Sequence, residues 1–346
     1  MIIYLIILFI ILFLVLIEDS IPPKQKKLIV YTLGFFFCIF ICVRAPGVDK
    51  DYTTYLSNWR LIKSGVWVSL EPLNTLIAYL SPSFFIYLLL YCVLGLSFKL
   101  KAIWLMSPLP LLSILIYYSH FIFLHEMTQI RIGVASGLIL LALYYKLGKK
   151  YRISVICAIL AFLFHYSAIV GVVIYFLNPY KNNLWKFFYI FIGCMGLYIM
   201  GISLISVFDW IKLGFITQKI QMYNLAMSMG QQDTIKVFNV AFLMQIFIGI
   251  ILLILNNKVY VNKYILPLSK LYWIGLCSYL LLTDIPAFAF RVAEIFMIGE
   301  FILIPSIFYL FTPKALSKIG ICMFGILYFV LNVMILKVVG DYRFLI

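Results

Sequence analysis

The stretch Thr128–His165 carries the side chains of this sequence that are best suited to chemistry. It opens with Arg131 at the start of an apolar run, and that run ends at four cations, Lys146, Lys149, Lys150 and Arg152. Apolar sequence then resumes and reaches His165. Charged and titratable side chains are costly in hydrocarbon and usually mark a function there. We therefore interpret this stretch as part of an active site inside a membrane protein.

Three arginines predict a site for an anion with several oxygens. Arg44, Arg131 and Arg291 each stand at the edge of an apolar run, and a guanidinium group binds phosphate oxygens in bidentate fashion. A diphosphate is the anion that fits best. His165 or Asp49 is the predicted base that activates a hydroxyl nucleophile. The set fits glycosyl transfer from a lipid diphosphate, and two further carboxylates join it as predicted substrate-binding residues, Glu71 and Asp284.

Each of these residues also has a structural interpretation. Arg44 can anchor a helix end by snorkelling. Arg291 can form an ion pair with Glu294, which follows it at i+3 on the same helix face. His165 can be a polar contact that fixes a turn, and Asp49 can be a solvated loop charge. Arg131 is the hardest to explain in this way, because apolar sequence follows it at once.

The composition predicts a helical membrane protein. The chain has 346 residues, of which 65% are hydrophobic and only 11% are charged. A soluble protein of this size needs far more polar surface. Apolar runs long enough to cross a bilayer recur along the whole length. The predicted fold class is an all-α polytopic membrane protein, with residues 1–346 forming a single integral membrane domain.

The basic residues predict topology and not a nucleic-acid partner. The formal net charge is +15, but the cations lie in short loops between apolar segments, as expected for loops on the cytoplasmic side. No basic domain exists that could hold nucleic acid.

The seven cysteines lie in apolar segments and form no CxxC pair, so neither a disulfide framework nor a zinc site is predicted. They are interpreted as small helix-packing residues. The three histidines lack the HExxH spacing, and no metal or cofactor is predicted.

The segment Ile153–Leu177 has two interpretations. As one helix it is a single span of about normal length. As two short pieces hinged at His165 it is a re-entrant helical hairpin. Only the hairpin places six later lysines in short inner loops, as the positive-inside rule favours: Lys181, Lys186, Lys258, Lys263, Lys314 and Lys318. The hairpin is therefore favoured, although Lys212, Lys219 and Lys236 count against it.

The resulting topology has about ten spans and one hairpin. Its predicted external loops are 44–71 and 209–236, and the first can carry an interfacial helix with Tyr55 and Trp59 on one face. Ser81-Pro82 predicts that Leu73–Phe98 is a short interfacial helix followed by a span, with Lys99 marking the inner end. Gly133 and Gly137 have the GxxxG spacing that lets a neighbouring helix approach closely. This topology gathers the candidate residues on the outer side.

Four motifs give the chain a resemblance to the EpsG family, within the wider Wzy-type polysaccharide polymerases. The first is RAPGVDKDYTTY at Arg44–Tyr55, and the second is Glu71-Pro72 before a helix. The third is the region around Arg131, followed by the basic turn and the FHYSA run that contains His165. The fourth is an arginine that opens a late helix, Arg291.

The resemblance implies a polymerase. Such proteins take oligosaccharide repeat units on undecaprenyl diphosphate at the outer face of the bacterial plasma membrane, and transfer the growing glycan to a sugar hydroxyl of the next unit. They resemble metal-independent GT-C-type transferases. The implied partners are these lipid-linked glycans, membrane lipids and a chain-length regulator, and the first motif adds Tyr52 to the substrate-binding set. The chain departs from the family pattern at two positions, where Thr128 replaces an asparagine and Ile132 a glutamine.

Two other functions fit the same residues. A transporter or flippase for the lipid-linked unit could use the same arginines, but transporters often show paired broken helices, and only one candidate hairpin is visible. An O-antigen ligase would run closely related chemistry on a different acceptor. The sequence separates a ligase poorly from a polymerase.

Overall fold

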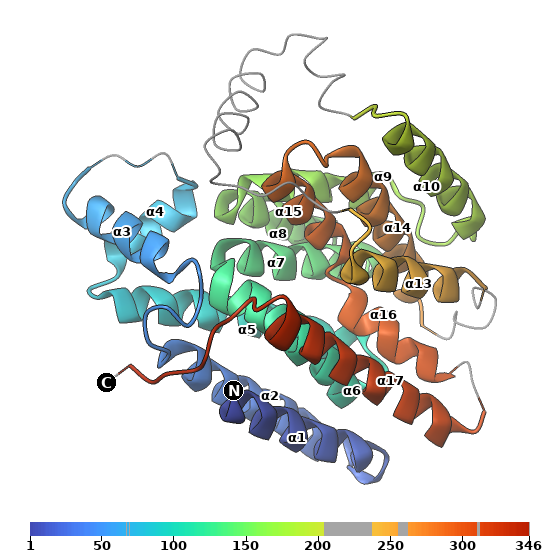
Figure 1. Ribbon diagram of the computed structural model, residues 1–346, viewed down its shortest axis with the longest axis horizontal. Coiled ribbons are helices and arrows are strands. Elements are labelled where there is room, and N and C mark those ends of the chain that lie inside the picture. Colours follow the sequence, from blue (N-terminus) through green and yellow to red (C-terminus); the bar gives the residue numbers. More distant parts are fainter. Residues whose placement is uncertain (67, 69, 204–236, 255–261, 310–311, 346) are drawn as a thin grey trace. The chain divides into compact units, whose positions relative to one another are not determined.

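The computed structural model describes residues 1–346 except 67, 69, 204–236, 255–261, 310–311 and 346 (Figure 1). The predicted external loop 209–236 therefore lies outside the described residues. Contacts divide the chain into two compact units, 1–175 with 300–346, and 176–299. Each is described by itself. The prediction of a single membrane domain concerns how the two units pack, so it stays a prediction.

The described residues are mostly helical, as predicted. The first unit contains α1 (Ile2–Leu16), α2 (Pro23–Cys42), α3 (Tyr52–Lys63), α4 (Pro72–Leu80), α5 (Phe84–Met106), α6 (Pro110–Ile116), α7 (Ile130–Leu147), α8 (Tyr151–Phe164), α9 (Val173–Phe176), α16 (Glu300–Ser306) and α17 (Lys314–Phe329). Helix α6 continues as a π-helix over Tyr117–Thr128. A proline stands at the first helical position of α2, α4 and α6, where its missing N–H costs nothing.

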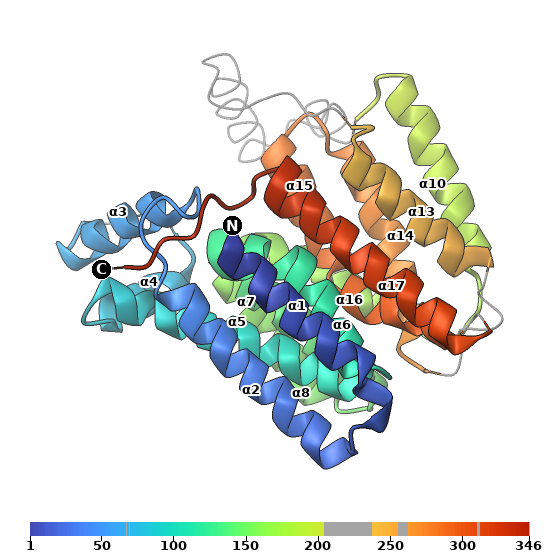
Figure 2. The ribbon, with the colours of Figure 1, turned by 60° about the horizontal axis from the view of Figure 1, so that its bottom comes forward.

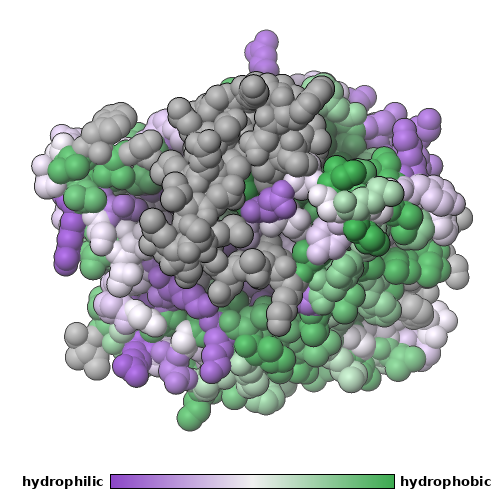
Figure 3. All heavy atoms as spheres, turned by 45° about the horizontal axis from the view of Figure 1, so that its top comes forward, coloured by the Kyte–Doolittle hydropathy of each residue, from purple (hydrophilic) through white to green (hydrophobic). Residues whose placement is uncertain are grey.

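The helix faces are those of a protein in lipid. In α1, a stripe at helical spacing is buried: Tyr4, Leu8, Ile11 and Val15. The opposite stripe is equally apolar but exposed: Ile2, Ile6, Phe9, Phe13 and Leu16. Broad areas of apolar side chains also reach the surface in Figure 3. Water would disfavour such faces, whereas lipid tails solvate them.

Among the described residues, four helices are long and apolar enough to cross a bilayer: Pro23–Cys42, Phe84–Met106, Ile130–Leu147 and Lys314–Ile335. Six shorter apolar helices accompany them: Ile2–Leu16, Tyr151–Phe164, Tyr166–Phe176, Leu184–Ile199, Val240–Ile254 and Ile265–Leu281. The structure thus agrees with a polytopic membrane protein. These four long helices are fewer than the about ten full spans predicted from the sequence.

The break at Ser81-Pro82 has the predicted effect. Helix α4 ends at Leu80, and the Ser83 side chain caps α5 by accepting from the Ile86 N–H at 3.3 Å. Because α5 begins only at Phe84 and runs to Met106, Lys99 lies inside this helix. It is fully buried and forms an ion pair with Glu126. The predicted end of the span at Phe98 was therefore wrong, because the helix continues to Met106.

The chain reverses at His165, as the hairpin interpretation predicts. Helix α8 ends at Phe164, and a 3-10 helix (Tyr166–Val172) and α9 lead back. The Tyr175 hydroxyl lies 2.8 Å from Ser154 Oγ in the first turn of α8. Lys146 at the end of α7 donates to the carbonyl of Ile174. A single straight helix would separate Ser154 and Tyr175 by about 30 Å. Re-entry of this hairpin into the membrane stays a prediction.

Glycines bring α7 close to its neighbours. A Cβ at Gly133 would lie 2.4 Å from the carbonyl oxygen of His125, and one at Gly137 would lie 3.0 Å from Phe98 Cβ. These approaches confirm the close contact that the GxxxG spacing predicts. Helix α7 is therefore held between the π-helix and α5.

An extended C-terminal segment packs against the loop after α2. The Gly340 N–H donates to Val48 O at 2.7 Å, the Ala45 N–H to Arg343 O at 2.9 Å, and the Leu345 N–H to Val43 O at 2.7 Å. Figures 1 and 2 show this segment running from the end of α17 toward α3. It joins parts of one unit that the sequence places at opposite ends.

The second unit contains α10 (Leu184–Ile199), α13 (Val240–Ile254), α14 (Ile265–Leu281) and α15 (Pro286–Met297). Its core centres on Trp273, which is fully buried with its ring 5.5 Å from Phe188 and 5.3 Å from Phe191. Lys270 is also buried and donates to the carbonyls of Asn178 and Lys181 at 2.6 Å each.

A glycine substitution tests the packing of α7. Gly133→Ala sets a methyl group against a backbone carbonyl that cannot turn aside, so we expect a loss of about 1–3 kcal/mol of stability. Thermal unfolding of the protein in detergent measures it. Gly196→Ala in α10 is the matched control, because nothing lies within 4 Å of its Cβ position. It should leave the melting temperature unchanged or raise it slightly. Equal melting temperatures for both variants would contradict the described packing.

Candidate functional site

Glu71, Arg131 and His165 form one cluster in the first unit. Arg131 Nη1 donates to Glu71 Oε2, and His165 Nε2 lies 3.9 Å from Glu71 Oε1. The Glu71 and His165 side chains are 7% and 8% exposed, whereas that of Arg131 is 19% exposed. One carboxylate thus stands between a guanidinium group and an imidazole, and the guanidinium is the member most open to a ligand.

The hairpin gives His165 a defined orientation. Its Nδ1 accepts from the backbone N–H of Ser167 at 3.2 Å, so the proton of a neutral imidazole is assigned to Nε2. That nitrogen faces Glu71. At 3.9 Å from Glu71 Oε1, this nitrogen lies beyond hydrogen-bond distance of the carboxylate. Helix α8 runs back along α7 from the turn at residues 148–150, and so brings the ring to the end of α7 that carries Arg131.

Glu71 is held by the short helix that follows it. It immediately precedes Pro72 of α4, and Asn74 lies within the first turn of that helix. The Asn74 side-chain oxygen accepts from the Tyr87 and Tyr91 hydroxyls at 2.7 and 2.8 Å. Asn74 is 2% exposed, so these bonds are shielded from water. They fasten α4 to α5 and fix the carboxylate that Arg131 and His165 share.

Tyr55 covers Arg131 from the other side. Its ring centroid lies 5.9 Å from the guanidinium carbon, a distance at which a cation is attracted to the ring face. Tyr55 belongs to α3, the helix predicted in the loop 44–71. This arrangement gives the loop helix a direct contact with the cluster. Sequence reasoning had placed Tyr55 on an interfacial face and had not linked it to Arg131.

Arg44 and Asp49 lie in a separate, buried ion pair. Arg44 Nε donates to Asp49 Oδ2 at 2.6 Å, and both side chains are 0% exposed. Arg44 also donates to Ile41 O at 2.6 Å and to Met127 O at 2.8 Å. Neither side chain reaches a surface where a substrate could bind. The pair instead connects the end of α2 with the residues that precede α7.

This ion pair positions α3. Asp49 Oδ1 accepts from the Asp51 N–H at 3.1 Å, just before α3 begins at Tyr52. The Tyr52 ring lies under Arg44 at 5.7 Å and packs edge-on against Phe84. Burial raises the pKa of the Tyr52 hydroxyl above its ordinary value, despite the nearby Arg44 guanidinium, so the phenol is neutral at physiological pH. Tyr52 is buried, and the substrate-binding role predicted for it stays a prediction.

Arg291 and Asp284 belong to the second unit and are described with it. Asp284 is exposed and accepts from the Ser203 hydroxyl. Arg291 is half-buried in α15. Their predicted substrate-binding roles stay predictions, as do the roles predicted for the residues of the first unit.

The two departures from the family motif have structural explanations. The Thr128 hydroxyl donates to the carbonyls of Leu124 and, at 3.3 Å, Phe123. It therefore hydrogen-bonds to the backbone at the end of the π-helix. Ile132 is 1% exposed and packs in the core of the unit. Neither position takes part in the cluster around Glu71.

A second polar cluster lies deeper in the same unit and was not predicted. Lys99, Glu126 and Tyr117 meet there: Lys99 pairs with Glu126, and the Tyr117 hydroxyl donates to the same carboxylate at 2.7 Å. All three side chains are buried. Gly95 makes room for the carboxylate, since a Cβ there would lie 2.2 Å from Glu126 Oε2. Lys99 and Tyr117 both lie in apolar sequence, and nothing in that sequence indicated that they share Glu126 as a partner.

Substitution of Arg44 separates a structural from a substrate-binding role. Arg44→Met leaves Asp49 as an unpaired buried charge, so we expect a loss of about 3–5 kcal/mol of stability. Arg44→Met with Asp49→Leu should recover part of it, because an apolar pair needs no counter-ion. Thermal unfolding in detergent measures both, with exposed Arg60→Met as the control. If Arg44→Met unfolds like the unmodified protein and loses only activity, Arg44 is a substrate ligand after all.

Comparison with known proteins gives one match. The model of the EpsG family matches residues 27–345, which takes in all four motifs and both units. No curated protein matches the chain, and no solved structure matches it. The family part of the resemblance is thus confirmed. The chain belongs to the EpsG family, which is associated with exopolysaccharide biosynthesis.

Proposed function

We propose that the protein is a membrane glycosyltransferase that polymerises undecaprenyl-diphosphate-linked oligosaccharide repeat units into a surface polysaccharide. It would act at the outer face of the bacterial plasma membrane. Family membership supports the pathway. The observation that carries the chemistry is the cluster in which Glu71 stands between Arg131 and His165.

Arg131 is the proposed ligand of the diphosphate. It is the only arginine of the cluster, and its side chain is more exposed than those of its two partners. A diphosphate offers several oxygens to the guanidinium fork. Its binding stabilises the charge that develops when the sugar–diphosphate bond breaks. Arg291 is proposed as a second diphosphate ligand on the strength of the family motif alone.

Glu71 is proposed as the base. The sequence favoured His165 or Asp49 for this role, but Asp49 is buried against Arg44, and both ring nitrogens of a neutral His165 are engaged or protonated. The carboxylate of Glu71 has the free lone pairs. When the diphosphate takes Arg131, Glu71 loses its cationic partner, and a carboxylate without a nearby cation accepts a proton more readily. Donor binding would thereby activate the acceptor.

The transfer balances with these two groups. The acceptor hydroxyl oxygen attacks the anomeric carbon of the donor, and its proton passes to Glu71. The bond between that carbon and the diphosphate oxygen breaks, and Arg131 binds the negatively charged lipid diphosphate as it leaves. His165 Nε2 lies 3.9 Å from Glu71 Oε1, close enough to attract the carboxylate electrostatically. His165 is a positioning residue in this scheme.

Variants of the cluster test the proposal. We expect Glu71→Gln and Arg131→Ala each to lower polymerisation about 100-fold, the effect of losing a few kcal/mol of transition-state stabilisation. The readout is the chain-length ladder of polysaccharide in a deletion strain complemented with each variant at matched membrane abundance. Exposed Arg60→Ala in α3 is the control for Arg131→Ala. Arg291→Ala is compared in the same strain.

A reaction with purified protein separates this proposal from its competitors. The polymerase should lengthen a lipid-linked glycan in detergent with no other protein present. Unchanged chain length, with movement of the lipid-linked unit across vesicles, would establish a flippase instead. Accumulation of finished polymer on its lipid in the deletion strain would establish a ligase. Long ladders from the Arg131→Ala strain would refute the assignment of that arginine.

A further inference from the structure

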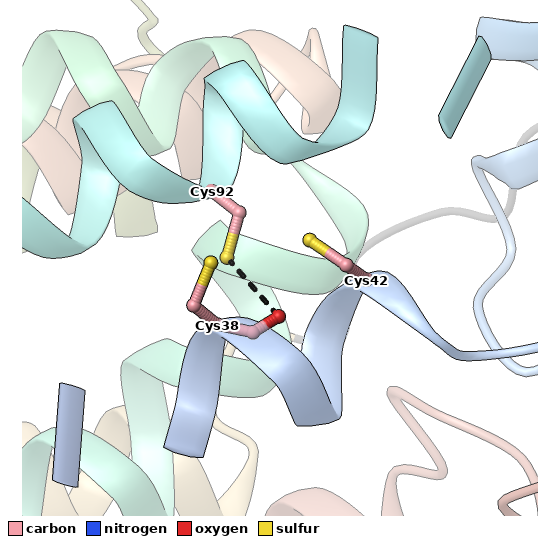
Figure 4. Close-up of side chains that lie close together, drawn as sticks. All are labelled: Cys38, Cys42 and Cys92. Atoms are coloured by element: carbon pink, nitrogen blue, oxygen red, sulfur yellow. Dashed lines mark hydrogen bonds between the residues drawn. The ribbon is translucent and has the colours of Figure 1, made fainter. Parts of the chain in front are cut away.

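Three thiols converge between α2 and α5. Cys38 and Cys42 lie one turn apart on α2, and Cys92 faces them from α5 (Figure 4). All three sulfur atoms lie within 4.8 Å of one another. The Cys92 thiol donates to the carbonyl of Cys38 at 3.9 Å. The sequence spacing did not reveal this group, because Cys38 and Cys42 form no CxxC pair and the third thiol comes from a different helix, α5.

The donor set selects the kind of ion. Three sulfur atoms suit soft, thiophilic ions, whereas calcium and magnesium require oxygen ligands. A structural zinc site is almost always four-coordinate. Among the residues that the structure describes, the group consists of these three cysteines and includes no histidine or carboxylate. The site is therefore suited to a three-coordinate ion.

The net charge of the bound complex narrows the choice of ion further. Cys42 and Cys92 are 3% and 2% exposed and Cys38 is half-buried, so two of the three thiols are shielded from water, and uncompensated charge inside a membrane bundle is costly. Arg44, two residues after Cys42, is already paired with Asp49. Three thiolates around a monovalent cuprous ion would carry two net negative charges. Three thiolates around a trivalent ion form a neutral complex.

We propose that Cys38, Cys42 and Cys92 form a binding site for a trivalent thiophilic ion of the arsenite class. Arsenous acid is neutral, so it can enter an apolar region without a charge penalty. Its three hydroxyl groups leave as water with the three thiol protons, and three arsenic–sulfur bonds form in their place. Arsenic stays trivalent throughout, so the step needs no oxidant or reductant. The product joins α2 to α5 through one atom.

This site is independent of the proposed polymerase activity. Its two α2 thiols lie in the last two turns of that helix, before Arg44 and the loop that positions α3. Binding can be measured on the protein alone.

The test measures arsenite binding to purified protein in detergent under reducing conditions. One variant keeps only the three cysteines of the site (C157S, C194S, C277S and C322S together). Its partner keeps only the other four (C38S, C42S and C92S together). We expect one arsenic per chain in the first variant, retained on desalting, and none in the second. Adding any one of C38S, C42S or C92S to the first variant should raise the apparent Kd at least ~10-fold.

X-ray absorption at the arsenic edge on the unmodified protein gives a second measurement that needs no substitution. Three sulfur neighbours per arsenic are expected. Two sulfur neighbours with one oxygen, or equal binding by both cysteine variants, would overturn the proposal. Binding of cuprous ion in the absence of arsenite binding would refute the charge argument and the assignment with it.

Discussion

A carboxylate that is kept from water needs donors around it, and Glu71 shows how this requirement organises the first unit. Its partners are Arg131 from the start of α7 and His165 from the turn of the hairpin. The three residues come from distant parts of the sequence, and none of them would be stable in an apolar bundle alone. The hairpin orients His165, the short helix α4 fixes Glu71, and the loop helix α3 places the Tyr55 ring against Arg131.

Burial distinguishes two arginines that look alike in the sequence. Arg44 has all its described contacts inside the protein, with Asp49 and two backbone carbonyls, and no exposed side-chain surface. Arg131 shares its carboxylate with a histidine and retains some exposure. The first arrangement is saturated and fixes a loop. The second leaves part of the guanidinium exposed, which the proposed binding of a diphosphate requires.

The sequence predicted several local features, whereas the sidedness of the loops stays a prediction. The reversal at His165 followed from counting lysines on either side of it, and the break before α5 followed from Ser81-Pro82. The pairing of charges could not be predicted in this way, because hydropathy assigns a residue to a helix but not to a partner. The substrate-binding role of Arg44 stays a prediction, but neither its partner nor that of Lys99, which was expected to follow the end of a span, was visible in the sequence. Arg44 and Lys99 turned out to lie in buried ion pairs whose other members are set by tertiary packing.

The pairing of residues 339–345 with the loop 43–49 has a consequence for the order of assembly. The Tyr342 hydroxyl reaches the carbonyl of Phe40, across a sequence separation of 302 residues. During synthesis, the translocon releases α2 and the loop long before their partner strand leaves the ribosome. The loop must therefore wait with its backbone groups unmatched until every intervening helix has been inserted. A chain arrested midway would contain Arg131 and His165 but would lack the segment that pairs with the Arg44 loop.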